Sequence, residues 1–220
     1  EYYANNIAHQ VDATLIFFTE NKRTPEKLNR HFDSFLTLFE QATGHPKSSV
    51  RQKTIELART LHPLPLWWGK SSTWLRVLQE TARIAQEEGL HANLAWAYLT
   101  QANILLVSTD ANKALSLAER ALHVAQKNRD TESIFRAEMM IFEAQKHLGK
   151  ISDRMLAIQV LEKSLAHKKA SIQADKVKKM EIELLIKKGD ILQRQGDTKE
   201  ALLMSQQAYR ISQKINGEKD

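Results

Sequence analysis

Apolar residues recur every three or four positions along almost the whole chain, which is the period of an α-helix. A first helix is expected to end near Asn21, a second to run from Thr24 to Gly44 with Pro25 in its first turn, and a third from about Ser49 to Leu61. No alternating strand pattern competes, so we predict an all-α protein. The apolar stripe of the second helix is Leu28, Phe32, Phe35, Leu36 and Phe39.

Helix-breaking residues are few and regularly placed. The chain has only seven glycines and four prolines among its 220 residues, which favours long helices over many short strands. After the segment HPLPLWWG, which stops the third helix, long helices are expected to be joined by short turns. We predict breaks near Gly69, Gly89, Thr109, Asn128, Gly149, Ala170 and Gly196.

Two similar segments occur in the chain: DANKALSLAERALHVAQ, which begins at Asp110, and DTKEALLMSQQAYRISQ, which begins at Asp197. The segment AIQVLEKSLAHKK lies between the two, and WLRVLQETARIAQ before them is a weaker copy. Repeats at this spacing predict stacked helical hairpins of about 40 to 44 residues each. The fold class expected is therefore a superhelix, or solenoid, of antiparallel helix hairpins. Small residues that would let neighbouring helices approach closely are Ala114, Ala118, Ala121, Ala201, Ser205 and Ala208.

From about Ser72 to Lys214 the chain resembles the tetratricopeptide repeat (TPR). The last unit matches the family's pattern of small and large residues best, the unit near Tyr98 matches well, and the middle unit is degenerate. The resemblance implies a TPR-like superhelix whose first helices line a concave surface that binds a protein or peptide. The matching residues are Leu185, Gly189, Leu192, Ala201 and Ala208, then Tyr98, Ala102, Leu105, Ala114 and Ala121, and in the middle unit Ala157, Leu161 and Ser164.

The N-terminal part is similar to the junction region of bacterial signalling ATPases of the STAND type, through Trp68, Gly69, Trp74 and Leu75. This resemblance implies a helical adaptor at residues 1–68, TPR-like repeats at 69–220, and a nucleotide site outside the sequence. Because the chain starts at Glu1 inside a helical pattern, we expect it to be a piece of a longer protein. Its expected role is the sensor or regulatory part of a signalling or transcription-regulating protein, acting on a protein partner or on a neighbouring domain of the same chain.

The sequence contains no recognisable set of catalytic residues. Its eight histidines form no i, i+4 pair, cysteine is absent, and neither a G-x-S-x-G turn nor a phosphate loop occurs. We therefore predict no enzyme activity, no metal site and no cofactor. No apolar run is long enough for a membrane span, and the lack of cysteine fits a cytoplasmic location.

The TPR resemblance also implies which residues would face a ligand. In chaperone-binding members of the family a Lys and an Asn clamp a C-terminal carboxylate; here Asn103 stands at the Asn position, but Leu99 stands where the Lys would be. This difference argues against a clamp and favours an apolar or helical ligand. The expected partner-binding residues are Trp96, Leu99, Asn103 and Leu106, and in the last unit Glu183, Ile186, Asp190 and Arg194.

Two further stretches each allow two interpretations. Trp67, Trp68 and Trp74 could form an exposed aromatic platform, or they could seal the joint before the first repeat, which we favour because exposed tryptophan is costly. The stretch from Lys163 to Lys188 could contact phosphates or an acidic protein, or it could be a solvated helix face. A contact with phosphates would make the chain a nucleic-acid-associated helical-repeat protein, which is the alternative function. The stretch lacks arginine and interleaved aromatic residues, so we favour the solvated face. The basic face would consist of Lys168, Lys169, Lys176, Lys178 and Lys179.

Overall fold

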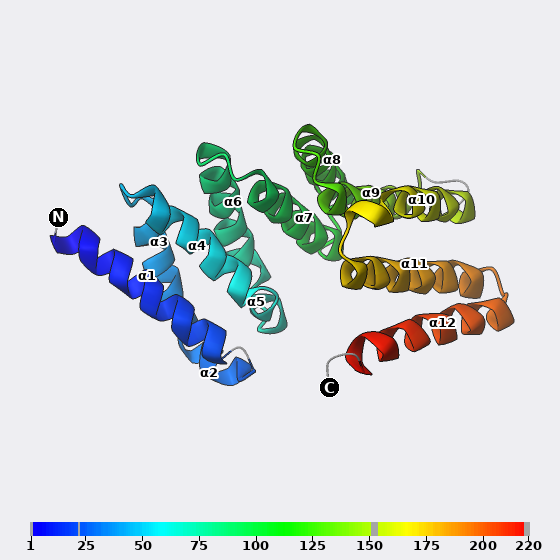
Figure 1. Cartoon of the computed structure of the whole chain (residues 1–220), viewed down its shortest axis with the longest axis horizontal. Helices are drawn as coiled ribbons and strands as arrows, with labels where there is room; N and C mark the ends of the chain where they lie inside the picture. Colours follow the sequence, from blue (N-terminus) through cyan, green and yellow to red (C-terminus); the bar gives the residue numbers. More distant parts are fainter. Residues whose placement is uncertain (1, 22, 151–153, 218–220) are drawn as a thin grey trace. The chain divides into compact units, whose positions relative to one another are not determined.

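The computed structural model describes residues 2–21, 23–150 and 154–217, and all regular secondary structure in these ranges is helical (Figure 1). The prediction of an all-α protein is therefore confirmed. The chain divides into two compact units, residues 1–128 and 129–220, and each is described by itself.

The first unit contains eight of the described helices, and two of them, α2 and α3, replace one helix of the sequence prediction. The single helix expected from Thr24 to Gly44 is interrupted at His31, whose backbone leaves the helical region at φ −99° and ψ 3°. The His31 ring makes an edge contact with Phe17, with 5.0 Å between ring centroids. The helices are α1 (Tyr2–Asn21), α2 (Pro25–Arg30), α3 (Phe32–Thr43), α4 (Ser48–Leu61), α5 (Leu64–Trp67), α6 (Ser71–Glu87), α7 (His91–Val107) and α8 (Ala111–Lys127).

One aromatic-rich core joins the helices of this unit from α1 to α7. Trp74 of α6 is fully buried, with its ring centroid 6.4 Å from that of Phe32 and 6.2 Å from that of Phe35. Leu61 of α4 and Ile104 of α7 belong to the same core. The predicted adaptor boundary at residues 68/69 thus lies within a continuous core, and a separate role for residues 1–68 stays a prediction.

In the described residues of the second unit there are four α-helices and one short 3₁₀ turn. Its core is formed by buried apolar residues from α9, α10 and α11, among them Phe135, Ile158 and Leu184. Helices α11 and α12 form an antiparallel hairpin (Figure 1). The elements are α9 (Thr131–His147), α10 (Arg154–Lys168), the 3₁₀ turn η1 (Lys169–Ser171), α11 (Ala174–Arg194) and α12 (Thr198–Gly217).

The turns between helices lie where the sequence predicts them. A residue with positive φ occurs at even intervals, at positions 69, 89, 109, 129 and 149, and again at 196. Four of these residues are glycine, which adopts this left-handed conformation without steric cost. The other two are Thr109 (φ 70°) and Arg129 (φ 54°).

The repeated small residues serve close helix packing, as predicted. On α8, Ala114, Ala118 and Ala121 are fully buried. On the last hairpin, a Cβ atom added at Gly189 would lie 3.4 Å from the carbonyl oxygen of Ala201, so the two helices meet backbone to backbone. The equivalent Ser205 is exposed, which shows that the outer hairpin is packed on fewer sides.

Candidate functional site

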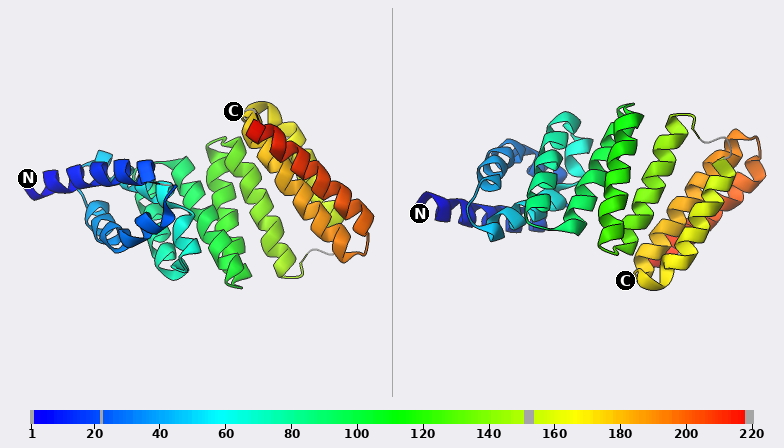
Figure 2. Two further views of the ribbon diagram at one scale, coloured as in Figure 1. Left: turned by 90° about the horizontal axis from the view of Figure 1, so that it is seen from below. Right: turned by 90° about the horizontal axis from the view of Figure 1, so that it is seen from above.

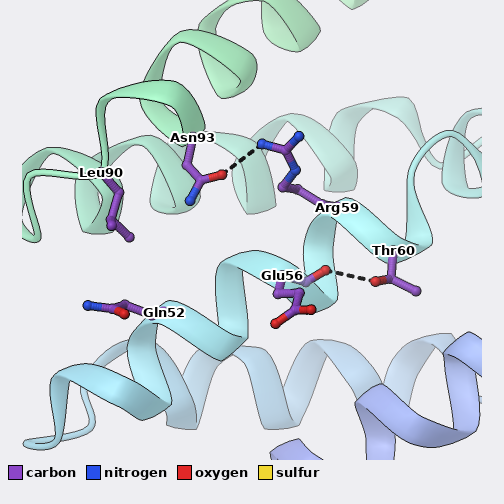
Figure 3. Close-up of a pocket in the computed structure, with 6 residues that line it drawn as sticks. All are labelled: Gln52, Glu56, Arg59, Thr60, Leu90 and Asn93. Atoms are coloured by element: carbon purple, nitrogen blue, oxygen red, sulfur yellow. Dashed lines mark hydrogen bonds between the residues drawn. The ribbon is translucent and has the colours of Figure 1, made fainter. Parts of the chain in front are cut away.

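A surface pocket of about 420 Å³ lies between α4 and the start of α7 (Figure 3). The Nη1 atom of Arg59 donates a hydrogen bond of 2.7 Å to the Oδ1 atom of Asn93 across this pocket. The guanidinium carbon of Arg59 also lies 5.0 Å from the centre of the Trp96 ring, a cation–π distance. The pocket is lined by Gln52, Glu56, Arg59, Thr60, Leu90 and Asn93.

Trp96 is in contact with two polar neighbours, His62 and Arg59. Its partly buried ring packs against the core of the first unit and meets His62 edge to face, with 5.9 Å between centroids. Burial lowers the pKa of His62, and its Nδ1 atom has no hydrogen-bond partner within the described part of the chain. The ring of Trp96 is therefore oriented by its contacts with His62 and with Arg59.

The other predicted residues of this helix differ in accessibility. Asn103 is exposed and Leu99 is half-buried, whereas Leu106 is only 9% exposed and offers little surface to a ligand. Helix α7 carries no Asp, Glu, Lys or Arg among its 17 residues. A ligand that covers Trp96, Leu99 and Asn103 would therefore have no charge of α7 itself to remove from water.

In the second unit the structure brings two of the four predicted residues to one pocket. Ile186 and Asp190 of α11 line a space of about 370 Å³ together with residues of α12, including Leu202. Asp190 accepts from the Nε atom of Arg194 at 3.1 Å, so these two predicted partner-binding residues form an ion pair with each other. Glu183 is exposed and does not line the pocket.

Much of the lysine stretch is used in ion pairs inside the second unit. Lys168 donates to both carboxylate oxygens of Glu138 at 2.8 Å, and Lys176 donates to Glu132 at 2.6 Å. Of the other residues proposed for a basic face, Lys169 and Lys179 are exposed and Lys178 is half-buried. Sequence reasoning missed these carboxylate partners, although Glu132 and Lys176 stand 44 positions apart, close to the repeat length. Two further pairs are Lys187–Glu143 and Lys188–Glu162.

The three clustered tryptophans have different environments. Trp74 is fully buried, and Trp68 is half-buried with its ring edge on Phe32, 5.7 Å between centroids. Trp67 alone of the three is open to solvent, with 70% of its surface exposed. The sealing interpretation thus holds for two rings, and a platform of three exposed rings is not formed.

The described residues form neither a metal-binding cluster nor a membrane-spanning helix. In the described ranges no three His, Asp or Glu side chains come together in an arrangement that could hold a metal ion. None of the helices described is long and apolar enough to cross a membrane.

No family model matches this chain, and no curated protein matches its sequence. Several solved structures are similar to the fold of this chain. BtubC (BKLC) from P. vanneervenii aligns with a TM-score of 0.65 and 14% identity, over 96% of this chain and 83% of its own. Two crystal structures of nearly identical TPR-like repeats from Podosopora anserina, described as putative kinesin light chain, give TM-scores of 0.63 and 0.60 at 14% identity, covering 95% and 94% of this chain and 97% of each of theirs. At this level of identity the likeness establishes the architecture alone: the chain has a TPR-like helical-repeat fold.

Proposed function

We propose that this chain is a non-catalytic scaffold that binds a protein segment on the first unit, along α7 and the adjoining pocket on α4. The observation that carries the proposal is the arrangement of Arg59, which is held between the ring of Trp96 and the amide of Asn93 beside the uncharged surface of α7. Helical-repeat folds of this type generally offer extended binding surfaces to other proteins.

Tryptophan and arginine are the residues that most often dominate the energy of protein interfaces. Trp96 and Arg59 are already oriented by their neighbours, so a ligand would not have to immobilise them on binding. Leu99 and Asn103 continue the surface towards the C-terminus of α7 and add one apolar and one amide contact. This composition suits a short apolar or amphipathic segment of a partner protein.

The wider context we propose is the sensor or regulatory part of a larger signalling or transcription-regulating protein in the cytoplasm. The partner would be a separate protein or peptide, or a neighbouring domain of the same chain. Binding would change how the repeat array packs on the domain that it restrains. The repeats and the resemblance of the segment around Trp68 and Trp74 to a STAND-type junction support this context.

A selection from a random peptide library displayed on phage tests the site. Selected peptides should bind the wild-type protein with micromolar affinity and lose at least tenfold with Leu99→Asp or Arg59→Glu. Lys127→Glu on α8 is the matched control, because it makes the same charge change at another exposed position of the unit. Binders that are insensitive to both pocket variants, or a selection that enriches none, would contradict the proposal.

A further inference from the structure

The outer face of α12 is unusually apolar for the outermost helix of a repeat unit. Leu202 is 57% exposed and Tyr209 is 63% exposed, and their i, i+7 spacing places them in one row. In Figure 2, left, α12 lies along α11 as the outermost helix of the second unit. Large apolar side chains exposed in one row are typical of a surface that binds another molecule.

A pocket runs beside this row, between α12 and α11. Its walls include Leu202 and Ile186, each 57% exposed, and small residues at Gly189 and Ala201 leave space between them. The volume of about 370 Å³ is enough for two or three apolar side chains projecting from one face of a helix. Half of the lining residues are polar, so the apolar strip consists of Ile186, Ala201 and Leu202 in the pocket and of Tyr209 beyond it. The polar lining residues are Asp190, Gln193, Thr198 and Ser205.

The other flank of the row is positively charged. At about 100° per residue, Lys199, Arg210 and Lys214 lie on the side of α12 that faces away from the pocket. All three are exposed, and none forms an ion pair in the described part of the chain. The only acidic residue of the helix, Glu200, lies about 160° around the axis from Leu202. A ligand on this strip therefore meets a positive border along one edge.

We propose that this surface binds an acidic amphipathic helix of a partner protein. The apolar side chains of that helix enter the pocket between Ile186 and Leu202, and its carboxylates face Lys199, Arg210 and Lys214. The interval from Lys199 to Lys214 corresponds to about 22 Å, or about four helical turns. The proposal extends the scaffold function to a second surface, on the second unit, and needs no contribution from Trp96 or Arg59.

Fluorescence anisotropy with two labelled, designed helical peptides, each about five turns long, tests the proposal. Both present the same leucine face, one with glutamates and the other with lysines on the polar face. The glutamate peptide should bind at least tenfold more tightly than the lysine peptide at low salt. Leu202→Ser should weaken it at least tenfold, and Arg210→Glu with Lys214→Glu should reverse the preference between the peptides.

Val160→Ser on α10 is the matched control, because Val160 is 58% exposed and carries the same kind of apolar side chain on another helix of the unit. It should leave binding unchanged, as should Leu99→Asp, which separates this surface from the first-unit site. Equal binding of both peptides, or equal loss in the Leu202 and Val160 variants, overturns the proposal. So does a dimer in sedimentation that Leu202→Ser dissociates, because the surface would then belong to a second copy of the chain.

Discussion

The Nζ atom of Lys187 on α11 donates a hydrogen bond of 2.8 Å to the Oε1 atom of Glu143 on α9, 44 positions earlier in the chain. Lys146, one turn along α9, approaches the second oxygen of the same carboxylate at 2.5 Å. Burial alone would raise the pKa of Glu143, but the hydrogen bonds from Lys146 and Lys187 outweigh it and keep the pKa below its ordinary value. The carboxylate thus ties two successive first helices of the repeat together.

Glu143→Gln should destabilise the second unit by about 1 to 2 kcal/mol, because it leaves two partly buried lysines without their common carboxylate. Urea unfolding followed by circular dichroism measures the loss. Glu183→Gln serves as the control, since Glu183 is exposed and its carboxylate lies 3.9 Å from the Nζ atom of Lys187. If both variants unfold at the wild-type midpoint, the buried pairing contributes nothing to stability.

His62 should make the stability of the first unit depend on pH. Burial lowers its pKa below 6.5, so as the pH falls the unfolded chain takes up a proton before the folded chain does. Stability is therefore complete above about pH 6.5 and declines below it. Urea midpoints between pH 8 and pH 5, read by tryptophan fluorescence, should fall less steeply in His62→Gln than in the wild type. His123→Gln, at an exposed position on α8, should keep the wild-type slope.

Replacement by alanine should change the stability far more at the buried Trp74 than at the exposed Trp67. Trp74→Ala removes a fully buried indole from the core and should cost about 3 to 5 kcal/mol of unfolding free energy. Trp67→Ala removes a ring that is 70% exposed and should change stability by less than about 0.5 kcal/mol. Denaturant unfolding by circular dichroism separates the two, and a large loss in the Trp67 variant would show a packing role that its exposure does not indicate.

The sequence predicts features of this fold that depend on a single residue type. Glycine adopts a left-handed turn without steric cost, so the turns at Gly69, Gly89 and Gly149 can be placed from the sequence. Close helix contact likewise needs small residues such as Ala114. The break at His31 cannot be placed in the same way, because the apolar stripe of Leu28, Phe32 and Phe35 continues through it and no glycine or proline marks it.

The candidate sites could be predicted only in part. The TPR resemblance points to Trp96, but no local pattern connects it with Arg59, which reaches it from another helix. Likewise, nothing near Lys176 in the sequence shows that its partner is Glu132, because the pair forms only when successive hairpins stack. Interactions between helices that lie a whole repeat apart are set by packing geometry, which hydrophobic periodicity does not encode.

Binding to nucleic acid should be weak and only moderately dependent on salt. With Lys168 and Lys176 in ion pairs, about three exposed lysines of the stretch, Lys163, Lys169 and Lys179, remain for phosphate contacts. The slope of log K against log salt should then be about −3 or shallower for a short DNA duplex. Anisotropy titrations from low to moderate salt measure it, and a slope steeper than about −5 would instead favour the basic face as a functional surface.

Thr109→Gly should stabilise the first unit by about 1 kcal/mol. A β-branched residue at φ 70° is strained, and glycine relieves that strain, although it also gives the unfolded chain more freedom. Arg129→Gly should gain less, because an unbranched side chain tolerates its φ of 54° better. Thermal unfolding of both variants tests the order, and equal or negative shifts would mean that the turns are not strained.

The even spacing of the left-handed turns from position 69 to position 149 means that helix plus turn acts as a unit of fixed length. A cassette of two helices, cut between equivalent turns, could be duplicated or removed, and each following helix would keep the same face towards its neighbour. One extra residue within a helix would rotate all later positions of that helix by about 100° and expose its buried alanines. Between positions 69 and 149 we therefore expect the chain to tolerate the insertion or removal of a whole hairpin. The insertion of a single residue within a helix should disrupt the packing.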